Sequence, residues 1–142
     1  SDEVAAVTKN ILDDVARFAP VTDFFLIDTL ASGPTQPVAG FVGITGETCD
    51  WTIARAVIDR SPIPVILAGG LAADNVCDAV VGLRPAGVDS CTRTNACDRN
   101  GRPVRFRKDL GKVRRFIAEV RRADDFLEGA AGDASSVNGK RA

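Results

Sequence analysis

The 142-residue sequence has no histidine, no methionine and no tyrosine, and it has a single tryptophan. Without histidine, any general acid or base has to be a carboxylate, a cysteine, a lysine or a backbone group. No apolar run approaches the length of a bilayer span, so we expect neither a transmembrane helix nor a membrane partner. The first ten residues are acidic and polar and lack the basic and then apolar pattern of a signal peptide.

The sequence has only four cysteines, and the spacing between them differs from that of the common metal sites. The four cysteines are Cys49, Cys77, Cys91 and Cys97, and no two of them form a C-x-x-C pair. A zinc site would need all four thiolates at spacings unlike the usual close pairs, so we expect no metal. Cysteines without a disulfide framework fit a reducing, cytoplasmic compartment.

The composition is typical of one soluble globular domain. Hydrophobic residues make up 45% of the chain and charged residues 26%, and the length suffices for a single domain. The net charge of −1 gives no general attraction to nucleic acid or to a membrane. Because the sequence begins with Ser1 rather than Met, it could be a fragment or a processed product.

The stretch over residues 63–76 predicts a strand, a turn and the start of a helix. Residues 65–68 are apolar throughout, as in a parallel strand that is buried on both faces. Gly69 and Gly70 would let the backbone approach a ligand closely, and a helix beginning at Asp74 would present free N–H groups to an anion. This arrangement suits a phosphate, although a tight turn that needs glycine only for its dihedral angles remains the alternative.

The rest of the chain alternates between helical and strand patterns. Helices are predicted over residues 2–19, 51–60, 74–84 and 110–122, and further strands over residues 24–28 and 86–89. Residues 30–46 and 90–107 read as loops, and residues 123–142 as a frayed or disordered tail. The last helix is expected to bury a stripe formed by Leu110, Val113, Phe116, Ile117 and Val120.

Two of the predicted strands end on a carboxylate, Asp28 and Asp89. The alternation of strands and helices predicts an α/β fold with a parallel sheet and crossover helices. Functional residues collect at the carboxyl ends of such strands, although Asp28 could instead cap a turn. Three strands cannot close a barrel, and an eight-stranded barrel takes about 250 residues, so the chain could be the last three-eighths of one.

Five segments, in order, resemble the C-terminal part of the phosphoribosylanthranilate isomerase family of tryptophan biosynthesis. They are residues 23–29 (DFFLIDT), 45–51 (TGETCDW), 64–76 (PVILAGGLAADNV), 84–90 (RPAGVDS) and 108–117 (KDLGKVRRFI). The resemblance implies that residues 1–122 form the last three strands and four helices of a (β/α)8, or TIM, barrel. It also implies a positioning role for Thr45, Gly46 and Trp51.

The resemblance implies an Amadori rearrangement, in which a phosphorylated aminoaldose opens its ring and becomes an aminoketose. Asp28 matches the family's general acid, and Asp89 matches the aspartate near the substrate amine. Gly69 and Gly70, with Ser90 in the next loop, match the segments that hold the substrate phosphate. No cofactor is implied, since the iminium ion formed on ring opening serves as its own electron sink.

The chain departs from the family pattern at three places. The family's base, a cysteine at the end of the first strand, has no counterpart here, so the chain alone is expected to be inactive unless Cys91 or Cys49 replaces it. The segment SCTRTN after Asp89 lacks the family's glycine and gains Arg93, which could bind the phosphate instead. The loop between Asp28 and Thr45 is longer than the corresponding loop of the family. A diverged sugar-phosphate-binding barrel with another substrate is therefore the alternative.

A non-catalytic interaction module is the second alternative. Residues 93–122 carry 11 of the 18 lysines and arginines, namely Arg93, Arg99, Arg102, Arg105, Arg107, Lys108, Lys112, Arg114, Arg115, Arg121 and Arg122. Such a face could contact nucleic acid, but it lacks stacking platforms, and a solvated helix face is the simpler and favoured explanation. We therefore expect no nucleic-acid partner. Unpaired sheet edges predict instead that the chain pairs with a missing N-terminal barrel segment or forms a homo-oligomer.

Overall fold

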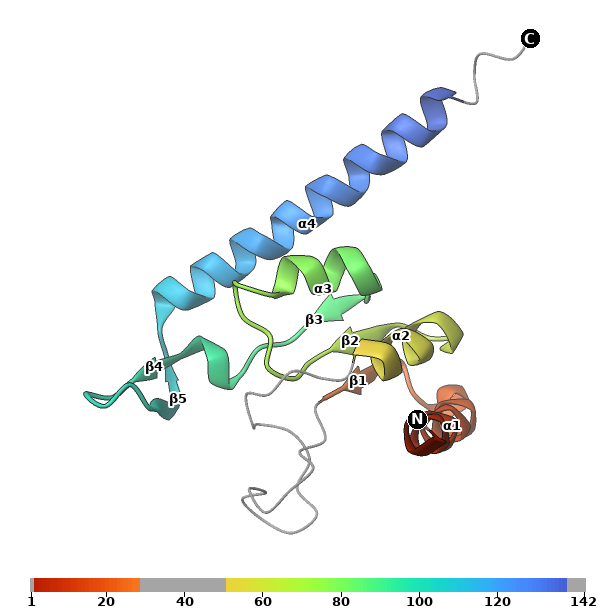
Figure 1. The fold of residues 1–142 in the computed structure, drawn as a ribbon, viewed down its shortest axis with the longest axis horizontal. Coiled ribbons are helices and arrows are strands. Elements are labelled where there is room, and N and C mark those ends of the chain that lie inside the picture. Colours follow the sequence, from red (N-terminus) through yellow and green to blue (C-terminus); the bar gives the residue numbers. More distant parts are fainter. Residues whose placement is uncertain (1, 29–50, 138–142) are drawn as a thin grey trace.

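The computed structural model describes the backbone of residues 2–28 and 51–137 and the side chains of residues 5–28 and 51–131. The expected loop over residues 30–46, with Thr45, Gly46 and Cys49, lies outside the described residues. The elements follow one another as α1 (Asp2–Phe18), η1 (Ala19–Val21), β1 (Phe25–Ile27), α2 (Trp51–Arg60), β2 (Val65–Leu67), α3 (Val76–Leu83), β3 (Gly87–Val88), η2 (Thr92–Thr94), β4 (Asn95–Cys97), β5 (Pro103–Lys108) and α4 (Leu110–Val137) (Figure 1).

Three parallel strands form the central sheet, in the order β1-β2-β3. The register aligns Ile27 with Leu67, and Leu67 with Val88. The hydrogen bonds continue one residue further, where the N–H of Ala68 donates to the carbonyl of Ile27 at 2.7 Å and the N–H of Asp89 donates to the carbonyl of Leu67 at 2.9 Å. The carboxyl ends of all three strands therefore meet at one edge of the sheet.

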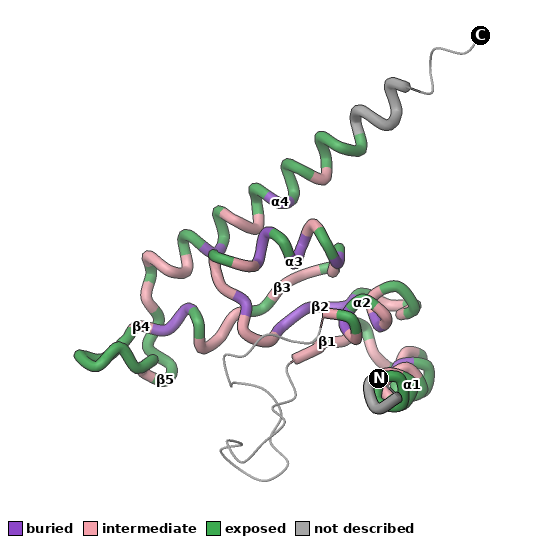
Figure 2. The backbone as a smooth tube through the Cα atoms, viewed as in Figure 1, coloured by how far each residue is buried: buried purple, intermediate pink, exposed green. Residues whose placement is uncertain are grey.

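The helices pack against the sheet face that carries Phe25, Ile27, Val65, Leu67 and Val88. Phe25 and Val65 belong to a core cluster with α1 and α2, and Leu67 and Val88 to a larger one with α3 and α4. Figure 2 shows buried positions along β2 and α3. Parallel strands with four helices confirm the predicted α/β class.

The other face of the sheet is only partly covered by the described residues. Side chains alternate between the faces of a strand, so Leu26 and Ile66 lie opposite the core-facing residues. Leu26 is 53% exposed and Ile66 is half-buried. Within the same part of the chain, no helix has the length and apolar character needed to cross a membrane.

Helix α3 begins at Val76, two residues later than the sequence predicted, because the side chain of Asn75 organises the turn before it. The N–H of Ala72 donates to Asn75 Oδ1 at 2.9 Å, and Asn75 Nδ2 donates to the carbonyl of Gly70 at 3.1 Å. The helix ends as expected, with Arg84 in a left-handed conformation (φ 55°) and Pro85 directly after it.

The prediction of an unstructured loop over residues 90–107 was wrong. Strands β4 and β5 pair antiparallel, with Asn95 opposite Lys108 and Cys97 opposite Pro103. Asp98 Oδ1 stabilises the turn between them, since it accepts hydrogen bonds from the N–H groups of Asn100 and Arg102 at 2.8 and 2.9 Å. Strand β5 alternates apolar and polar residues over residues 104–107, a short strand signal that the loop prediction overlooked, and all of its residues but Val104 are exposed.

Helix α4 was predicted to end at residue 122, but it continues to Val137. Its buried stripe runs through Phe116, Val120, Ala123 and Leu127, and Ala123 is fully buried in the larger core cluster. The stripe predicted from the sequence was partly wrong, because Leu110 is 66% exposed and Ile117 43%. Residues 123–137, which were expected to be frayed, are thus helical, and alanine-rich segments favour that state.

Candidate active site at the carboxyl ends of the parallel strands

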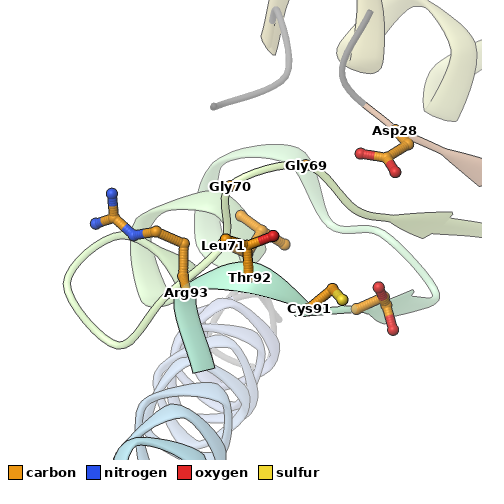
Figure 3. Close-up of a pocket in the computed structure, with 8 residues that line it drawn as sticks. Asp28, Gly69, Gly70, Leu71, Cys91, Thr92 and Arg93 are labelled. Carbon is orange, nitrogen blue, oxygen red and sulfur yellow. The ribbon is translucent and has the colours of Figure 1, made fainter. Parts of the chain in front are cut away.

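A hollow at the carboxyl ends of β1, β2 and β3 brings together five of the six predicted site residues. Its lining consists of Asp28, Gly69, Gly70, Leu71, Asp89, Cys91, Thr92 and Arg93 (Figure 3). Three segments that are distant in sequence supply these residues, one after each strand. The parallel register accounts for the convergence, since it places the three strand ends at one edge.

Asp28 and Asp89 follow the two outer strands, with the end of β2 between them. Asp28 is half-buried and points from the end of β1 into the hollow (Figure 3). Asp89 follows β3 and is exposed. Because adjacent strands lie about 4.8 Å apart, the Cα atoms of the two aspartates are about 10 Å apart. This spacing leaves room for a small polar molecule between one carboxylate that is partly shielded and one that is open to solvent.

Gly69 and Gly70 form the floor between the two aspartates. Their φ angles are 91° and 61°, so both residues occupy the left-handed region that a side chain disfavours. The need for glycine is therefore conformational, which was one of the two interpretations of this turn. Both glycines also line the hollow, so the phosphate hypothesis for this turn stays a prediction.

Ser90 does not line the hollow, but it holds two of its loops together. Its hydroxyl donates a hydrogen bond of 2.6 Å to the carbonyl oxygen of Leu71. Leu71 is 1% exposed and anchors the loop after β2 in the core. The hydroxyl hydrogen of Ser90 is thus engaged within the protein, so its contribution to the site is to position the loops.

Arg93 stands at the rim of the hollow and is bound to an acidic neighbour. Its Nη2 lies 3.1 Å from Asp74 Oδ2 and 3.4 Å from Asp74 Oδ1. In Figure 3 the guanidinium points away from Asp28. The side chain is 44% exposed, so it can reorient toward an anion in the hollow by giving up a pair that is worth at most about 1 kcal/mol.

Cys91 and Thr92 complete the wall after β3. Cys91 has a free, half-buried thiol that lines the hollow, and its replacement of the missing base stays a prediction. Thr92 and Leu71 also line the hollow but were not predicted as site residues. The available signal was their position in the sequence, since Thr92 directly precedes Arg93 and Leu71 directly follows Gly70. Trp51 packs against the larger core cluster at the start of α2.

The hairpin of β4 and β5 is hydrogen-bonded to the loop after β3, which lines the hollow. Lys108 Nζ donates to the carbonyl of Cys91 at 2.6 Å and to Thr94 Oγ1 at 2.9 Å. Thr94 is 4% exposed, and its own hydroxyl donates to the carbonyl of Cys91 at 2.9 Å. Lys108, which belongs to the predicted basic surface, therefore stabilises the loop after β3.

Of the other basic residues of this surface, Arg93 lies in η2 and Lys112 is half-buried, and the rest are exposed on the hairpin and on α4. The guanidinium of Arg105 stacks over the ring of Phe106, 5.0 Å from its centroid. Among the residues that the structure describes, no group of three or more cysteine, aspartate or glutamate side chains is arranged to hold a metal ion.

Known proteins match most of the chain. The family model of N-(5'phosphoribosyl)anthranilate (PRA) isomerase matches residues 4–119. The chain is 36% identical over 129 residues to N-(5'-phosphoribosyl)anthranilate isomerase 1 of Methanosarcina mazei, covering 89% of this chain and 49% of that protein. It is 42% identical over 110 residues to the isomerase of Halobacterium salinarum, covering 78% and 45%. The chain thus spans about half the length of the curated relatives it matches.

Solved structures show the same fold. The phosphoribosyl anthranilate isomerase of Thermococcus kodakaraensis superposes with a TM-score of 0.55 at 28% identity, over 85% of this chain and 47% of that one. The Pyrococcus furiosus isomerase superposes with a TM-score of 0.52 at 24% identity, over 81% and 42%. Both matches span most of this chain and less than half of the other.

Proposed function

The chain belongs to the N-(5'-phosphoribosyl)anthranilate isomerase family, and we propose that it supplies the acid and phosphate-binding part of that enzyme's active site. The single observation that carries the proposal is the convergence of Asp28, Asp89 and the Gly69–Gly70 turn on one hollow. Each of them follows a different parallel strand, at the end where barrel enzymes place their chemistry.

The proposed setting is a (β/α)8 barrel of which residues 1–122 form the last three strands and four helices. The partly uncovered face of the sheet supports this, because Leu26 is 53% exposed where a barrel interior would enclose it. In the part of the chain that the structure describes, β1 and β3 each have one unpaired edge, as strands cut from a closed barrel would have. A missing N-terminal segment is therefore the partner that would complete the site.

Asp28 acts as general acid in this proposal. It donates a proton to the ring oxygen of the aminoaldose, the bond between C1 and the ring oxygen breaks, and the nitrogen lone pair forms an iminium ion with C1. A base then removes the proton from C2, and the electrons of that bond neutralise the iminium to give an enolamine. The enolamine becomes the 2-ketone when C1 takes up a proton and the 2-hydroxyl group releases one. Asp89, which follows β3 on the side of β2 opposite Asp28, orients the substrate amine.

The phosphate lies against the Gly69–Gly70 turn, with Arg93 as an additional donor. Backbone N–H groups at a glycine turn bind phosphate because no Cβ blocks the approach. Arg93 is the cation of the lining and offers a planar pair of donors that suits a phosphate. A substrate anchored at that end would extend toward the two aspartates.

The test is isomerase turnover by a completed barrel. The chain is joined to the amino-terminal half of the Methanosarcina mazei relative, and consumption of phosphoribosylanthranilate is followed. The proposal predicts turnover that requires both halves. A folded chimera that binds sugar phosphates without turning this substrate over would favour the diverged barrel with another substrate. A folded chimera that binds neither would overturn the proposal.

A further inference from the structure

A second hollow shares Arg93 with the candidate active site but is lined by neither Asp28 nor Asp89. It has a volume of about 270 Å³ and is lined by Asp74, Arg93, Thr94, Lys112, Arg115 and two alanines of the loop after β2. Three separate parts of the fold form it, namely that loop, η2 and the first turns of α4. Typical ligand sites measure about 300–1,000 Å³, so this hollow suits a small ligand.

The lining carries more positive than negative charge. Arg93, Lys112 and Arg115 are opposed by the single carboxylate of Asp74. Lys112 Nζ donates to the carbonyl of Asn95 at 2.9 Å and lies 3.4 Å from Cys97 Sγ. Cations that converge on a small hollow favour an anion with several acceptor oxygens.

Besides Asp74 in the lining, the carboxylate of Asp109 lies near Lys112 and Arg115, and both carboxylates already have partners. Asp74 pairs with Arg93 and is 69% exposed, so it stands at the rim and can turn toward solvent. Asp109 Oδ1 accepts a hydrogen bond from the N–H of Lys112 at 3.0 Å, which ties it to the first turn of α4. This bond, with the nearby charges of Lys112 and Arg115, holds the pKa of Asp109 below its usual value.

We propose that this second hollow binds a small dianion, of the phosphate-monoester or inorganic phosphate class, through Arg115, Lys112 and the guanidinium of Arg93. The ligand replaces the carboxylate of Asp74 as the ion-pair partner of Arg93. Because Arg93 lines both hollows, occupation of the second one withdraws this cation from the candidate active site. The inference rests on the second hollow itself and does not depend on the isomerase proposal.

The experiment is a titration of the full chain with inorganic phosphate, followed by residue-resolved amide NMR. Sodium chloride at matched ionic strength is the control for screening. Saturable shifts at Lys112 and Arg115 report the second hollow, and shifts at Gly69 and Gly70 report the first one independently. The two proposals can therefore fail separately. Absence of saturable shifts at both Lys112 and Arg115 would overturn this one.

Matched variants sharpen the test. Arg115→Gln is expected to weaken phosphate binding at the second hollow about fivefold, the effect of losing one exposed charge contact. Arg114→Gln, at the neighbouring exposed position that does not line the hollow, should leave binding unchanged. Asp74→Asn should tighten binding severalfold, because it removes a competing carboxylate. Equal affinities in Arg115→Gln and Arg114→Gln, or weaker binding in Asp74→Asn, would contradict the proposal.

Discussion

The hydroxyl of Ser90 and the carbonyl of Leu71 join the loops after β3 and β2 by a hydrogen bond of 2.6 Å. Both loops contribute to the candidate active site, one through the segment around Arg93 and the other through the Gly69–Gly70 turn. The distance between the two groups of site residues is thus set by a bond that spans 19 residues of sequence.

Ser90→Ala should lower the free energy of unfolding by about 1 kcal/mol, the usual net value of such a hydrogen bond. It should also weaken phosphate binding at the Gly69–Gly70 turn severalfold, because the loops lose their tie. Urea unfolding and phosphate titration measure the two effects. Ser61→Ala is the matched control, since Ser61 also donates to a backbone carbonyl, that of Ile63 at 2.7 Å, but at the amino end of β2. Equal phosphate affinity in both variants would refute the positioning role of Ser90.

Gly69→Ala should destabilise the chain by about 1–2 kcal/mol, since alanine is strained at a φ of 91°. Its methyl group should also reduce phosphate binding at the turn. Gly82→Ala is the control, because Gly82 lies in α3 and a methyl group added there would meet nothing within 4 Å. That change should stabilise the chain by about 0.5–1 kcal/mol. A Gly69→Ala variant as stable as wild type would show that the turn tolerates a side chain.

Leu67→Ala should cost about 2–5 kcal/mol in unfolding free energy, because Leu67 is fully buried at the centre of the sheet. Leu110→Ala removes the same atoms from a position that is 66% exposed, and its effect should stay within about 0.5 kcal/mol. Chemical denaturation of both variants measures the difference. Comparable losses would mean that the first turn of α4 is buried after all, as the sequence pattern had predicted.

Asp109 should make stability depend on pH in the acidic range. Its pKa is lowered from 3.8, chiefly by the hydrogen bond from the Lys112 N–H, although burial opposes the shift. A lowered pKa in the folded state means that the ionised form contributes stability above the ordinary pKa and loses it as the pH falls through the lowered one. Asp109→Asn retains an amide that can cap α4 but does not titrate.

The difference in melting temperature between wild type and Asp109→Asn should therefore be largest near neutral pH and shrink below about pH 4. Thermal unfolding over that range is the measurement. A difference that stays constant, or that grows on acidification, would contradict the assigned cause of the shift.

Elements with an unbroken apolar pattern could be predicted from the sequence. The bounds of α2 agreed with the prediction, and β1, β2 and β3 were identified because their residues are apolar and end at a carboxylate or a glycine. The grouping of Asp28, Gly69 and Asp89 followed from the same reasoning, since residues after parallel strands meet at one edge, whereas Arg93 was identified through the resemblance to the isomerase family.

Features that depend on contacts across the fold could not be predicted in this way. Strand β5 is almost wholly exposed, and Lys108 ties the hairpin to Cys91 through a hydrogen bond that spans 17 residues. Helix α4 continues because Ala123 packs into the core, and a small residue gives little sign of such packing in a sequence. The partners of Ser90 and Arg93 are likewise set by the fold, although both residues were recognised as site candidates.

The role of Asp28 as general acid is the central claim, and a comparison of wild type with Asp28→Asn in the completed barrel tests it most directly. Asparagine keeps the shape of the side chain but cannot donate the carboxylic proton. The account predicts that kcat for phosphoribosylanthranilate falls by about 10²–10⁴-fold while binding of a phosphorylated product analogue is retained. Wild-type turnover in Asp28→Asn would contradict it, and the acid would then have to lie elsewhere in the barrel.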